Sequence, residues 1–509
     1  MSRHGFGGLG RAALVCGLAL TLLASAAPAS GSASGHLSPL HATRGAGPGI
    51  FDARGREVLL RGVNVNGLGD YYQSNPAYPT VVPLRRTDFA RIRRLGFNSV
   101  RLLMSWSRLQ PQPGAYNRRY VMRVRRAVGW ARAQGLYVVL DMHQDAWGKY
   151  IATPPGETCP PGTSASIGWD GAPRWATITD GVSTCNLGLR ELSPAVGQAW
   201  ESFYTDREGI QTELVETWGR LARGFAGNPA VAGFDLLNEP NPGLAPGVND
   251  VTALGNFYGR AIEAIREGER SRPGGFGHIV FFEPGVIWSA AGTYSTPPPS
   301  FTDDENIVFA PHIYAESIAA ATIDQGFGYA RDTARGYGTT VWSGEWGYFG
   351  DPEEDADKAR RYGEAEDAAA WGGAWWDYKQ ACGDPHVIHE RGGLPDPVSP
   401  SLVRFACDEN GGVGKELGVP RPFAEALGRA VPRAVPGEIV SLRSSGEQGT
   451  MRLTARLPGR SCGLRVYAPR RPEGIEVRGT HLGRLRVSRA GGAFLIKACV
   501  RGEYSVTVG

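Results

Sequence analysis

The sequence predicts an α/β protein in which a (β/α)8 barrel, the TIM-barrel architecture, is followed by a small C-terminal antiparallel β-sandwich domain. Two observations predict the barrel. Short apolar runs recur along residues 45–430, and stretches with helical periodicity separate them. Repeated alternation of strand and helix is typical of a closed parallel barrel. The third observation is alternation of apolar and polar residues within residues 434–509, which predicts the β-sandwich.

The apolar runs are dense in Val, Ile, Leu and aromatic residues and lack strict alternation. That composition is typical of parallel strands buried on both faces. We therefore expect eight barrel strands. The runs are Val58–Val65, Ser99–Trp106, Tyr137–Met142, Gly233–Leu237, His278–Glu283, Ile307–Ile313, Thr339–Gly344 and Gly373–Tyr378.

Several segments between the runs carry helix signals. Phe89–Leu95 and Tyr120–Gln134 have helical periodicity, and each is followed by a glycine, which commonly ends a helix. A Gly/Pro/Thr-rich insertion at residues 148–200 follows the third run. Loops of that length are uncommon and often functional. Because the insertion follows a strand, we expect it at the carboxyl end of the barrel.

The C-terminal part has a different pattern. Runs such as Met451–Leu457 and Leu464–Tyr467 alternate apolar and polar residues, with turn residues between them. This pattern predicts a small antiparallel β-sandwich over residues 434–509. The proline-containing stretch Val431–Gly437 is interpreted as the linker.

The N-terminus predicts export. Two basic residues, Arg3 and Arg11, precede a short apolar run, Ala12–Ala24, and small residues follow this run. Residues 1–29 therefore read as a signal peptide. The run is shorter than the roughly 20 residues that a membrane-spanning helix needs. We expect a secreted, extracellular protein.

Six cysteines remain beyond the signal peptide, and an even number in an exported chain suggests disulfides. Pairing between nearest neighbours is favoured because each such pair lies within one region, although other pairings are open. The spacing of these cysteines is not that of a zinc site. The residues are Cys159, Cys185, Cys382, Cys407, Cys462 and Cys499.

The composition is that of an ordinary globular protein. Hydrophobic residues make up 42% and charged residues 20% of the chain. The net charge is +4 without long basic runs, so nothing indicates a nucleic-acid partner. We expect a monomer. The chain has 13 Trp, most of which will pack in cores, while some could stack on sugar rings.

Polar and ionisable side chains follow the apolar runs, at the points where barrel strands are expected to end. Because the carboxyl ends of barrel strands form one rim, these side chains should converge there, and burying them unpaired would be costly. The sequence therefore predicts an active site on this rim. The candidates are His143, Asp145, Asn238, Glu239, His312, Tyr314, Glu345 and Trp376.

Glu239 and Glu345 are the candidate catalytic residues. They end runs that lie across the barrel mouth from each other. A retaining glycosidase needs two carboxyl groups about 5–5.5 Å apart, one as acid/base and one as nucleophile. Either glutamate alone could be a salt-bridge residue at the start of a loop. The two together favour catalysis, with Glu239 as acid/base and Glu345 as nucleophile.

The motifs around these glutamates resemble those of a known family. Leu236–Pro240 resembles the acid/base motif of glycoside hydrolase family 5, and Ser343–Gly347 is similar to its nucleophile motif. The resemblance covers roughly residues 50–430 and implies a barrel hydrolase. His312 and Tyr314 match the family's His-x-Tyr, and Arg101, His143 and Trp376 fit further rim positions.

Roles follow from the resemblance and from physical reasoning together. Asn238 would bond the sugar 2-hydroxyl. Tyr314 and Arg101 would keep Glu345 ionised. Glu239 must start protonated, so its pKa should be raised by its site.

The other rim residues are substrate-binding candidates. His312 would contact Glu239 or the substrate, and Trp376 would form the floor beneath the sugar. His143 could instead be an inner-rim histidine with satisfied hydrogen bonds, and Asp145 could cap the next loop. Glu283 is expected on the rim without a catalytic role.

Within the family, Asp141–Asp145 looks most like the endoglycoceramidase group, whose members cut between glycan and ceramide in glycosphingolipids. That resemblance implies a glycosphingolipid or oligosaccharide substrate and transient contact with a membrane surface. An apolar groove beside Glu239 would hold the ceramide. Its candidate lining residues, which could alternatively pack the insertion onto the barrel, are Trp147, Trp175, Trp200, Phe203 and Tyr204.

One departure from the family bears on the sugar. Glucose-preferring relatives carry a lysine after the first strand, and Asn64–Tyr72 contains none, so a preference for galactosylceramide-type lipids is open.

Two other functions are also open. One is a family 5 β-glycanase acting on polysaccharide, and the other is a glycan- or lipid-binding protein without turnover. No metal or organic cofactor is expected, since two carboxylates suffice for the chemistry.

Overall fold

The computed structural model describes residues 37–388, 393–480, 485–490 and 493–509. The predicted signal peptide at residues 1–29 lies outside the described residues. Within the described part of the chain, every helix is too short or too polar to span a bilayer.

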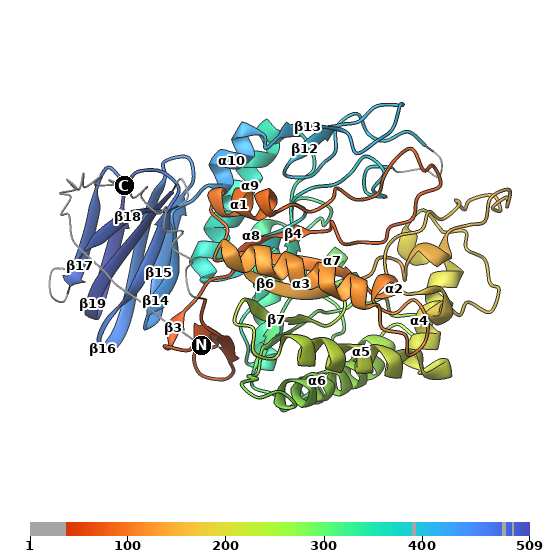
Figure 1. The fold of residues 1–509 in the computed structure, drawn as a ribbon, viewed down its shortest axis with the longest axis horizontal. Helices are drawn as coiled ribbons and strands as arrows, with labels where there is room; N and C mark the ends of the chain where they lie inside the picture. The colour runs from red at the N-terminus through yellow and green to blue at the C-terminus, as the bar shows by residue number, and fades with distance from the viewer. Residues whose placement is uncertain (1–36, 389–392, 481–484, 491–492) are drawn as a thin grey trace, which may run out of the picture. The chain divides into compact units, whose positions relative to one another are not determined.

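The predicted (β/α)8 barrel is confirmed (Figure 1). Its eight strands are parallel and lie in the order β10-β11-β4-β5-β6-β7-β8-β9. The ring closes between β9 and β10, where the Phe309 amide donates to the Thr340 carbonyl at 3.2 Å. The strands are β4 (Arg61–Val65), β5 (Ser99–Ser105), β6 (Tyr137–His143), β7 (Val231–Asp235), β8 (Ile279–Phe282), β9 (Ile307–Phe309), β10 (Trp342–Trp346) and β11 (Gly372–Trp375).

The strand limits differ from the apolar runs in ways that affect the site. Strand β7 ends at Asp235, before Asn238, and β9 ends before His312, so these residues lie on loops. Strand β10 extends through Glu345 to Trp346, and Glu345 lies where the register of β10 with β11 shifts. The physical reason is that strand ends are set by hydrogen bonds to neighbouring strands, which hydrophobicity alone does not reveal.

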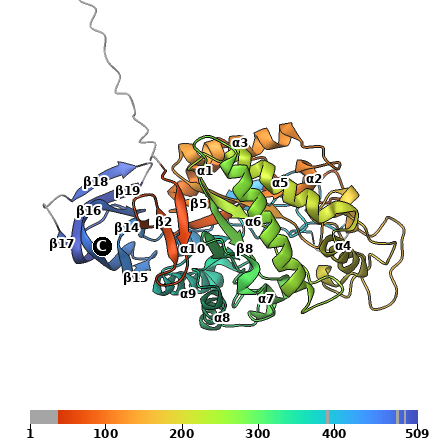
Figure 2. The ribbon, with the colours of Figure 1, turned by 90° about the horizontal axis from the view of Figure 1, so that it is seen from below.

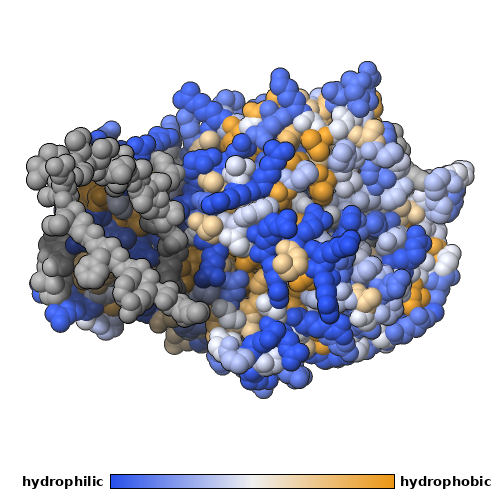
Figure 3. Space-filling view, in the orientation of Figure 1, coloured by the Kyte–Doolittle hydropathy of each residue, from blue (hydrophilic) through white to orange (hydrophobic). Residues whose placement is uncertain are grey.

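The helices cover the barrel. The two predicted helices are present as α1 and α3, within a few residues of their expected limits. Helices α5 and α6 pack side by side (Figures 1 and 2), and hydrophilic residues cover much of the face on which α3 lies (Figure 3). The helices are α1 (Arg86–Arg94), α2 (Trp106–Leu109), α3 (Arg118–Ala133), α4 (Pro194–Tyr204), α5 (Ile210–Phe225), α6 (Leu254–Arg270), α7 (Val286–Ala291), α8 (Ile323–Tyr337), α9 (Pro352–Ala369) and α10 (Arg421–Leu427).

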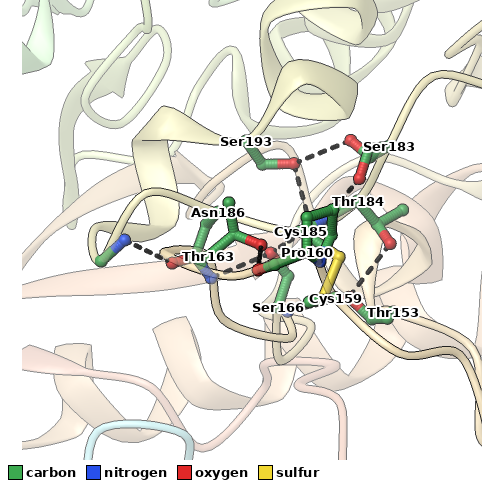
Figure 4. Close-up of a disulfide and its surroundings, with 11 residues drawn as sticks. Thr153, Cys159, Pro160, Thr163, Ser166, Ser183, Thr184, Cys185, Asn186 and Ser193 are labelled. Carbon is green, nitrogen blue, oxygen red and sulfur yellow. Dashed lines mark hydrogen bonds between the residues drawn. A yellow bond between two sulfur atoms is a disulfide. The ribbon is translucent and has the colours of Figure 1, made fainter.

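The insertion after β6 is held by a disulfide between Cys159 and Cys185 (Figure 4). Beside it, the amides and carbonyls of Ser164 and Asn186 exchange two hydrogen bonds of 2.9 Å. Short helical turns punctuate the insertion, one of them at Arg190–Leu192. The cross-link gives a segment with little regular structure a defined path over the barrel rim.

The aromatic residues suggested for the ceramide groove pack the insertion onto the barrel instead. Trp147, Trp200 and Phe203 are buried, with ring centres of Trp147 and Trp200 4.9 Å apart. Trp175 and Tyr204 pack against the same core. The groove hypothesis for these residues is therefore wrong. Their large apolar rings stabilise the insertion more by burial than they would at an open rim.

The C-terminal part is the predicted antiparallel β-sandwich. Two long strands, β16 (Thr450–Ala468) and β19 (Ala493–Val508), pair along their lengths and bend at register shifts. One half of this pair is flanked by β15 (Glu438–Ser445) and β17 (Ile475–Thr480), and the other by β14 (Val431–Pro436) and β18 (Arg486–Ala490). Apolar side chains of both halves, such as Leu453 and Ile496, share one core.

The stretch interpreted as a linker is strand β14. It pairs with β16 on one side and with β3 (Arg56–Glu57) on the other. Pro432 is accommodated where the ladder is irregular, since the register shifts between Pro432 and Ala434, and Pro436 is the last residue of the strand. Strand β3 also pairs with β2 (Gly49–Asp52), which pairs with β1 (Leu40–Thr43). A small separate sheet joins β12 (Arg404–Ala406) and β13 (Lys415–Gly418).

The nearest-neighbour disulfide pairing is confirmed. Besides Cys159–Cys185, the chain contains Cys382–Cys407 and Cys462–Cys499. The first two cross-link loops of the barrel, and the third joins the two long strands of the β-sandwich.

Candidate active site

The two predicted catalytic carboxylates meet at the carboxyl end of the barrel. A carboxylate oxygen of Glu239, one of Glu345 and a ring nitrogen of His312 all lie within 4.8 Å of one another. Glu239 follows β7, and Glu345 lies on β10 across the ring. A retaining glycosidase places its two carboxyl groups about 5–5.5 Å apart, and the closeness of these oxygens agrees with that arrangement.

The backbone at Glu239 is constrained. Its φ is +38°, a left-handed value that is uncommon for a residue with a side chain. Its amide donates to Oε2 of Glu283 at 2.8 Å, and its carbonyl accepts from Nε2 of Gln144 at 3.0 Å. These bonds hold a strained loop end that aims the Glu239 side chain across the barrel.

Arg101, on β5, sits at the centre of the barrel rim with no exposed side-chain surface. Its guanidinium lies 2.8 Å from Asp235, 2.7 Å from Glu283, 2.7 Å from Glu345 and 3.0 Å from Asp141. Burial lowers the pKa of Arg101, but these carboxylates outweigh burial and raise it well above its ordinary value. The guanidinium thus supplies the positive charge that a metal ion would otherwise bring to the acidic cluster.

Arg101 also orients two asparagine side chains. It donates to Oδ1 of Asn64 at 3.1 Å and to Oδ1 of Asn238 at 2.9 Å. Nδ2 of Asn238 in turn donates to the Gln144 carbonyl at 2.9 Å. The amide of Asn238 is therefore held in one orientation beside the carboxylate pair.

Glu345 is held from two sides, as predicted. Arg101 donates to its Oε1 at 2.7 Å, and the Tyr314 hydroxyl donates to its Oε2 at 2.7 Å. Gly344 makes room for the neighbouring His312, since a Cβ at this glycine would lie 3.0 Å from the imidazole. Burial nevertheless raises the pKa of Glu345, because it outweighs the nearby positive charges of His312 and Arg101.

His312 joins the two glutamates. Its Nδ1 lies 2.8 Å from Oε1 of Glu239 and 3.4 Å from Oε2 of Glu345, and its Nε2 lies 3.2 Å from Glu283. Burial lowers the pKa of His312, but Glu283 and Glu345 outweigh burial and raise it well above its ordinary value. These carboxylates therefore favour the protonated imidazole, whose Nδ1 lies within hydrogen-bond distance of Glu239.

The expectation that the site raises the pKa of Glu239 is wrong. Burial raises this pKa, but the hydrogen bond and charge of His312 and the charge of Arg190 outweigh burial and lower it. Arg190, from the insertion, lies 3.4 Å from Oε2 of Glu239. The difference arises mainly because the hydrogen bond and charge of His312 act on Glu239, and Arg190 adds a second charge from a loop that local sequence does not indicate.

Comparison with known proteins identifies the family to which this chain belongs. Residues 51–382 match the model of the family described as Cellulase (glycosyl hydrolase family 5). This chain belongs to glycosyl hydrolase family 5. It is accordingly a glycoside hydrolase.

This family 5 hydrolase is similar to endoglycoceramidases. It is 29% identical over 286 residues to Endoglycoceramidase I of Rhodococcus hoagii (strain 103S), covering 54% of this chain and 54% of that protein. The chain thus spans about half the length of the curated relatives that it matches.

Two solved structures extend the likeness. The crystal structure of endogalactoceramidase is 44% identical, with a TM-score of 0.84, and the match covers 93% of this chain and 100% of the other. Endo-glycoceramidase II from Rhodococcus sp., in a ganglioside GM3 complex, is 25% identical with a TM-score of 0.67, over 90% and 98% of the two chains.

The remaining predicted rim residues of this family 5 hydrolase also converge. His143 lies 2.9 Å from Asp141 and 3.3 Å from Asp145, and its ring stacks on that of Trp376 with centres 5.3 Å apart. Asp145 also lies 2.8 Å from Arg190. Burial raises the pKa of Asp145, but Arg190 and His143 outweigh burial and lower it. These residues form one wall of the site.

A cavity of about 510 Å³ opens over the carboxylate pair, a volume typical of ligand sites. Glu239, Glu345 and Trp376 line it. Polar residues such as Asp145, Arg190 and His386 also line it. Apolar groups from several loops complete the lining, and they include Ile167, Trp169, Ile318, Phe349 and Pro385. A glycan and an apolar group could thus be bound in one continuous space.

Sequence reasoning missed two functional contacts of the family 5 hydrolase. Glu283 was expected on the rim without a role, yet it bonds the Glu239 amide, Arg101 and His312. Arg190 was not singled out at all. The position of Glu283, an acidic residue at the end of an apolar run, could have indicated a role in the site. No pattern in the sequence around Arg190 indicated its contact with Glu239.

Proposed function

We propose that this protein is a retaining endo-β-glycosidase that hydrolyses the bond between glycan and ceramide in glycosphingolipids. The observation that carries the proposal is the pair of carboxylates, Glu239 and Glu345, within 4.8 Å of each other at the base of a half-apolar cavity. Glu239 acts as acid/base and Glu345 as nucleophile.

In the first step the Glu345 carboxylate attacks the anomeric carbon. The bond from that carbon to the ceramide oxygen breaks, and the oxygen takes a proton from Glu239. Ceramide leaves, and the glycan remains bound to Glu345 as an ester. Tyr314 and Arg101 hold the attacking carboxylate at 2.7 Å each, so it reaches the reaction without rearrangement.

His312 is placed to supply the proton for this step, since its Nδ1 lies 2.8 Å from Oε1 of Glu239. The leaving-group oxygen needs the space beside Glu239 that Arg190 approaches. Substrate that moves Arg190 away removes one of the charges that lower the pKa of Glu239, and so favours proton transfer from His312.

In the second step Glu239, now a carboxylate, takes a proton from water. The water oxygen attacks the anomeric carbon, the ester bond to Glu345 breaks, and the free glycan leaves with its β configuration retained. The second hydrogen of Asn238 Nδ2 is available to the sugar 2-hydroxyl, while Trp376 offers its face beneath the ring.

The lipid part of the substrate is supported by the apolar side of the cavity and by its surroundings. Leu187, Leu189 and Leu192, which flank Arg190 in the insertion, are 65%, 63% and 49% exposed, and Ile318 on the cavity lining is 74% exposed. Exposed apolar groups gathered at a site rim are typical of lipid contact. They support transient binding to a membrane surface.

A preference for galactosylceramide-type lipids is part of the proposal. It rests on the absence of lysine in Asn64–Tyr72 and on the 44% identity with endogalactoceramidase.

Secretion as a monomer is also proposed. The leader at residues 1–29 and the three disulfides support export, since disulfides persist in oxidising compartments.

Product analysis on glycosphingolipids tests the substrate. The protein is incubated with galactosylceramide-type and glucosylceramide-type lipids and with a soluble β-glucan, and products are identified by mass spectrometry. We expect intact oligosaccharide plus ceramide, faster from the galactose series, with little release from the β-glucan. Release from the polysaccharide alone would identify a β-glycanase.

Variants test the two glutamates. Glu345→Gln should abolish turnover while it leaves glycolipid binding intact. Glu239→Gln should lose about 10²–10⁴-fold on glycolipid but much less on a substrate with an acidic phenol leaving group, which needs no proton. Glu353→Gln, an exposed residue of α9, is the matched control. Turnover by Glu345→Gln would refute the nucleophile assignment.

A further inference from the structure

A second cavity, at the opposite end of the barrel from Glu239, gathers arginines. Its volume is about 140 Å³, and Arg56, Arg93, Arg433 and Arg465 line it; we refer to it as the arginine cavity. Other lining residues come directly before β5 and β6, which places it at the amino ends of the barrel strands. The remaining walls come from β14, β16 and β19 of the β-sandwich.

The positive charge in this cavity is not balanced by the protein. Among the described residues that line it, Asp52 alone carries a carboxylate, and it is already paired with Arg56, whose Nε donates to it at 2.9 Å. In the described ranges, Arg93, Arg433 and Arg465 form no ion pair with a carboxylate. Unpaired charge in a partly closed space is costly unless a counter-ion is bound.

Arg433 lacks an acceptor for one of its guanidinium nitrogens. Its Nη2 donates to the backbone oxygens of Gly96 and Phe97, and its guanidinium lies 4.5 Å from the ring centre of Tyr467. Its Nη1 is buried and has no hydrogen-bond partner among the residues that the structure describes. Burial lowers the pKa of Arg433 to about 10, and the charge of Arg93 acts in the same direction. An acceptor facing Nη1 would relieve this cost.

Three basic residues lie opposite one another on neighbouring strands of the β-sandwich. Arg465 on β16 pairs with Lys497 on β19, which pairs with Arg486 on β18. Like charges directly opposite one another on a sheet are destabilising. Burial and the neighbouring Arg56 also lower the pKa of Arg465. An anion bound beside Arg465, which lines the cavity, would relieve the share of this repulsion that involves Arg465.

We propose that the arginine cavity binds a compact oxyanion of the phosphate or sulfate type, with Arg433 and Arg465 as its main ligands. Guanidinium groups match the oxygens of such anions in a forked geometry. The cavity is smaller than the roughly 300–1,000 Å³ of sites for organic ligands, which favours a free ion or a terminal phosphate group. The bound anion would join the amino end of the barrel to the β-sandwich.

Equilibrium dialysis with radiolabelled orthophosphate tests binding to the whole chain at constant ionic strength. We expect one saturable site per chain, weakened at least about tenfold in Arg433→Met and in Arg465→Met. Arg452→Met, an exposed residue on the same strand as Arg465, is the matched control and should bind as the original chain does. The Arg465 variant remains informative if loss of the Arg433 backbone contacts impairs folding.

Thermal unfolding supplies a second readout. Phosphate stabilises many proteins without binding, but that effect does not saturate and does not depend on one arginine. Site binding should raise the apparent Tm by about 2 °C or more, saturably, in the original chain and not in Arg465→Met.

Vesicles distinguish the source of the phosphate group. Vesicles of phosphatidylcholine with phosphatidic acid are compared with phosphatidylcholine alone. Arg465-dependent binding of these vesicles without binding of free phosphate would assign the site to a lipid headgroup. If neither is bound, or if both arginine variants bind as the original chain does, the proposal is overturned.

Discussion

Arg190 reaches from the disulfide-linked insertion to within 3.4 Å of Glu239, the residue that the proposed mechanism requires in protonated form. The same guanidinium lies 2.8 Å from Asp145 and 4.3 Å from the ring centre of Trp169. A cation in this position opposes protonation of the acid/base in the free enzyme. The insertion thereby affects the chemistry as well as the shape of the cavity.

Arg190→Met should move the alkaline limb of the pH profile. Because Arg190 lowers the pKa of Glu239, its removal raises that pKa, and the protonated form persists to higher pH. We expect the alkaline limb of kcat/KM to shift to higher pH. Arg207→Met removes an exposed ion pair with Asp180 and serves as the control. An unchanged limb would contradict the role of Arg190.

Tyr314→Phe should slow the reaction without unfolding the protein. The change removes the 2.7 Å hydrogen bond to Oε2 of Glu345 and leaves the ring in place. A hydrogen bond to a charged group contributes about 1.5–3 kcal/mol, so kcat should fall about 10- to 100-fold. Steady-state kinetics measure this fall, and Tyr329→Phe on α8 should have no comparable effect. Equal rates for both variants would argue against Tyr314 holding the nucleophile.

Arg101→Met should destabilise the fold in a pH-dependent way. It leaves Asp141, Asp235, Glu283 and Glu345 buried together without their shared counter-charge. Breaking such an arrangement costs about 3–5 kcal/mol. Burial raises the pKa of Asp235 and of Glu345, and the charge of Arg101 opposes this rise. Loss of the guanidinium should therefore raise both pKa values further, so the cost falls as these two carboxyls become protonated at lower pH.

Denaturant unfolding of Arg101→Met at pH 5 and pH 8 measures this difference, with the larger loss expected at pH 8. The control is Arg335→Met, whose ion pair with Asp332 is exposed on α8 and should contribute little. A loss that does not change between the two pH values would show that packing, rather than charge, accounts for the effect.

Glu57→Gln should stabilise the protein at alkaline pH. Burial and the nearby charge of Glu438 raise the pKa of Glu57 to about 7, so the folded state binds more protons than the unfolded state between about pH 4.5 and 7. Stability therefore falls as pH rises through that range. The amide removes this loss, and we expect a gain of about 1–3 kcal/mol at pH 8 over pH 5. Denaturant unfolding tests it, with the exposed Glu503→Gln as a control that should show no such gain.

Much of the fold and of the catalytic pair could be predicted because both depend on local pattern. Buried parallel strands are continuous apolar runs, and the residues that end them must share a rim. Glu239, Glu345, His312 and Tyr314 were placed in this way, and their convergence is observed. The nearest-neighbour disulfides followed from similar reasoning about regions.

Other features could not be predicted from pattern. Val431–Pro436 has the composition of a linker, yet it becomes strand β14 because β3 and β16 both offer it hydrogen bonds. Trp147 and Trp200 look suited to bind lipid, yet they face each other in a core. The residue types of a segment allow more than one structure. The contacts that decide between a linker and a strand, or between a lipid-binding and a core tryptophan, come from distant parts of the chain.

The amino-acid sequence by itself determined the barrel, the β-sandwich, the family and the identity of the two glutamates, because each follows from side-chain type and spacing along the chain. Only the tertiary structure decided the charge state around Glu239, the central place of Arg101 among four carboxylates, and the unbalanced arginines at the far end of the barrel. Electrostatic energies depend on distances through space and on burial, and residues such as Arg190 and Glu239, 49 positions apart, acquire both only when the chain has folded.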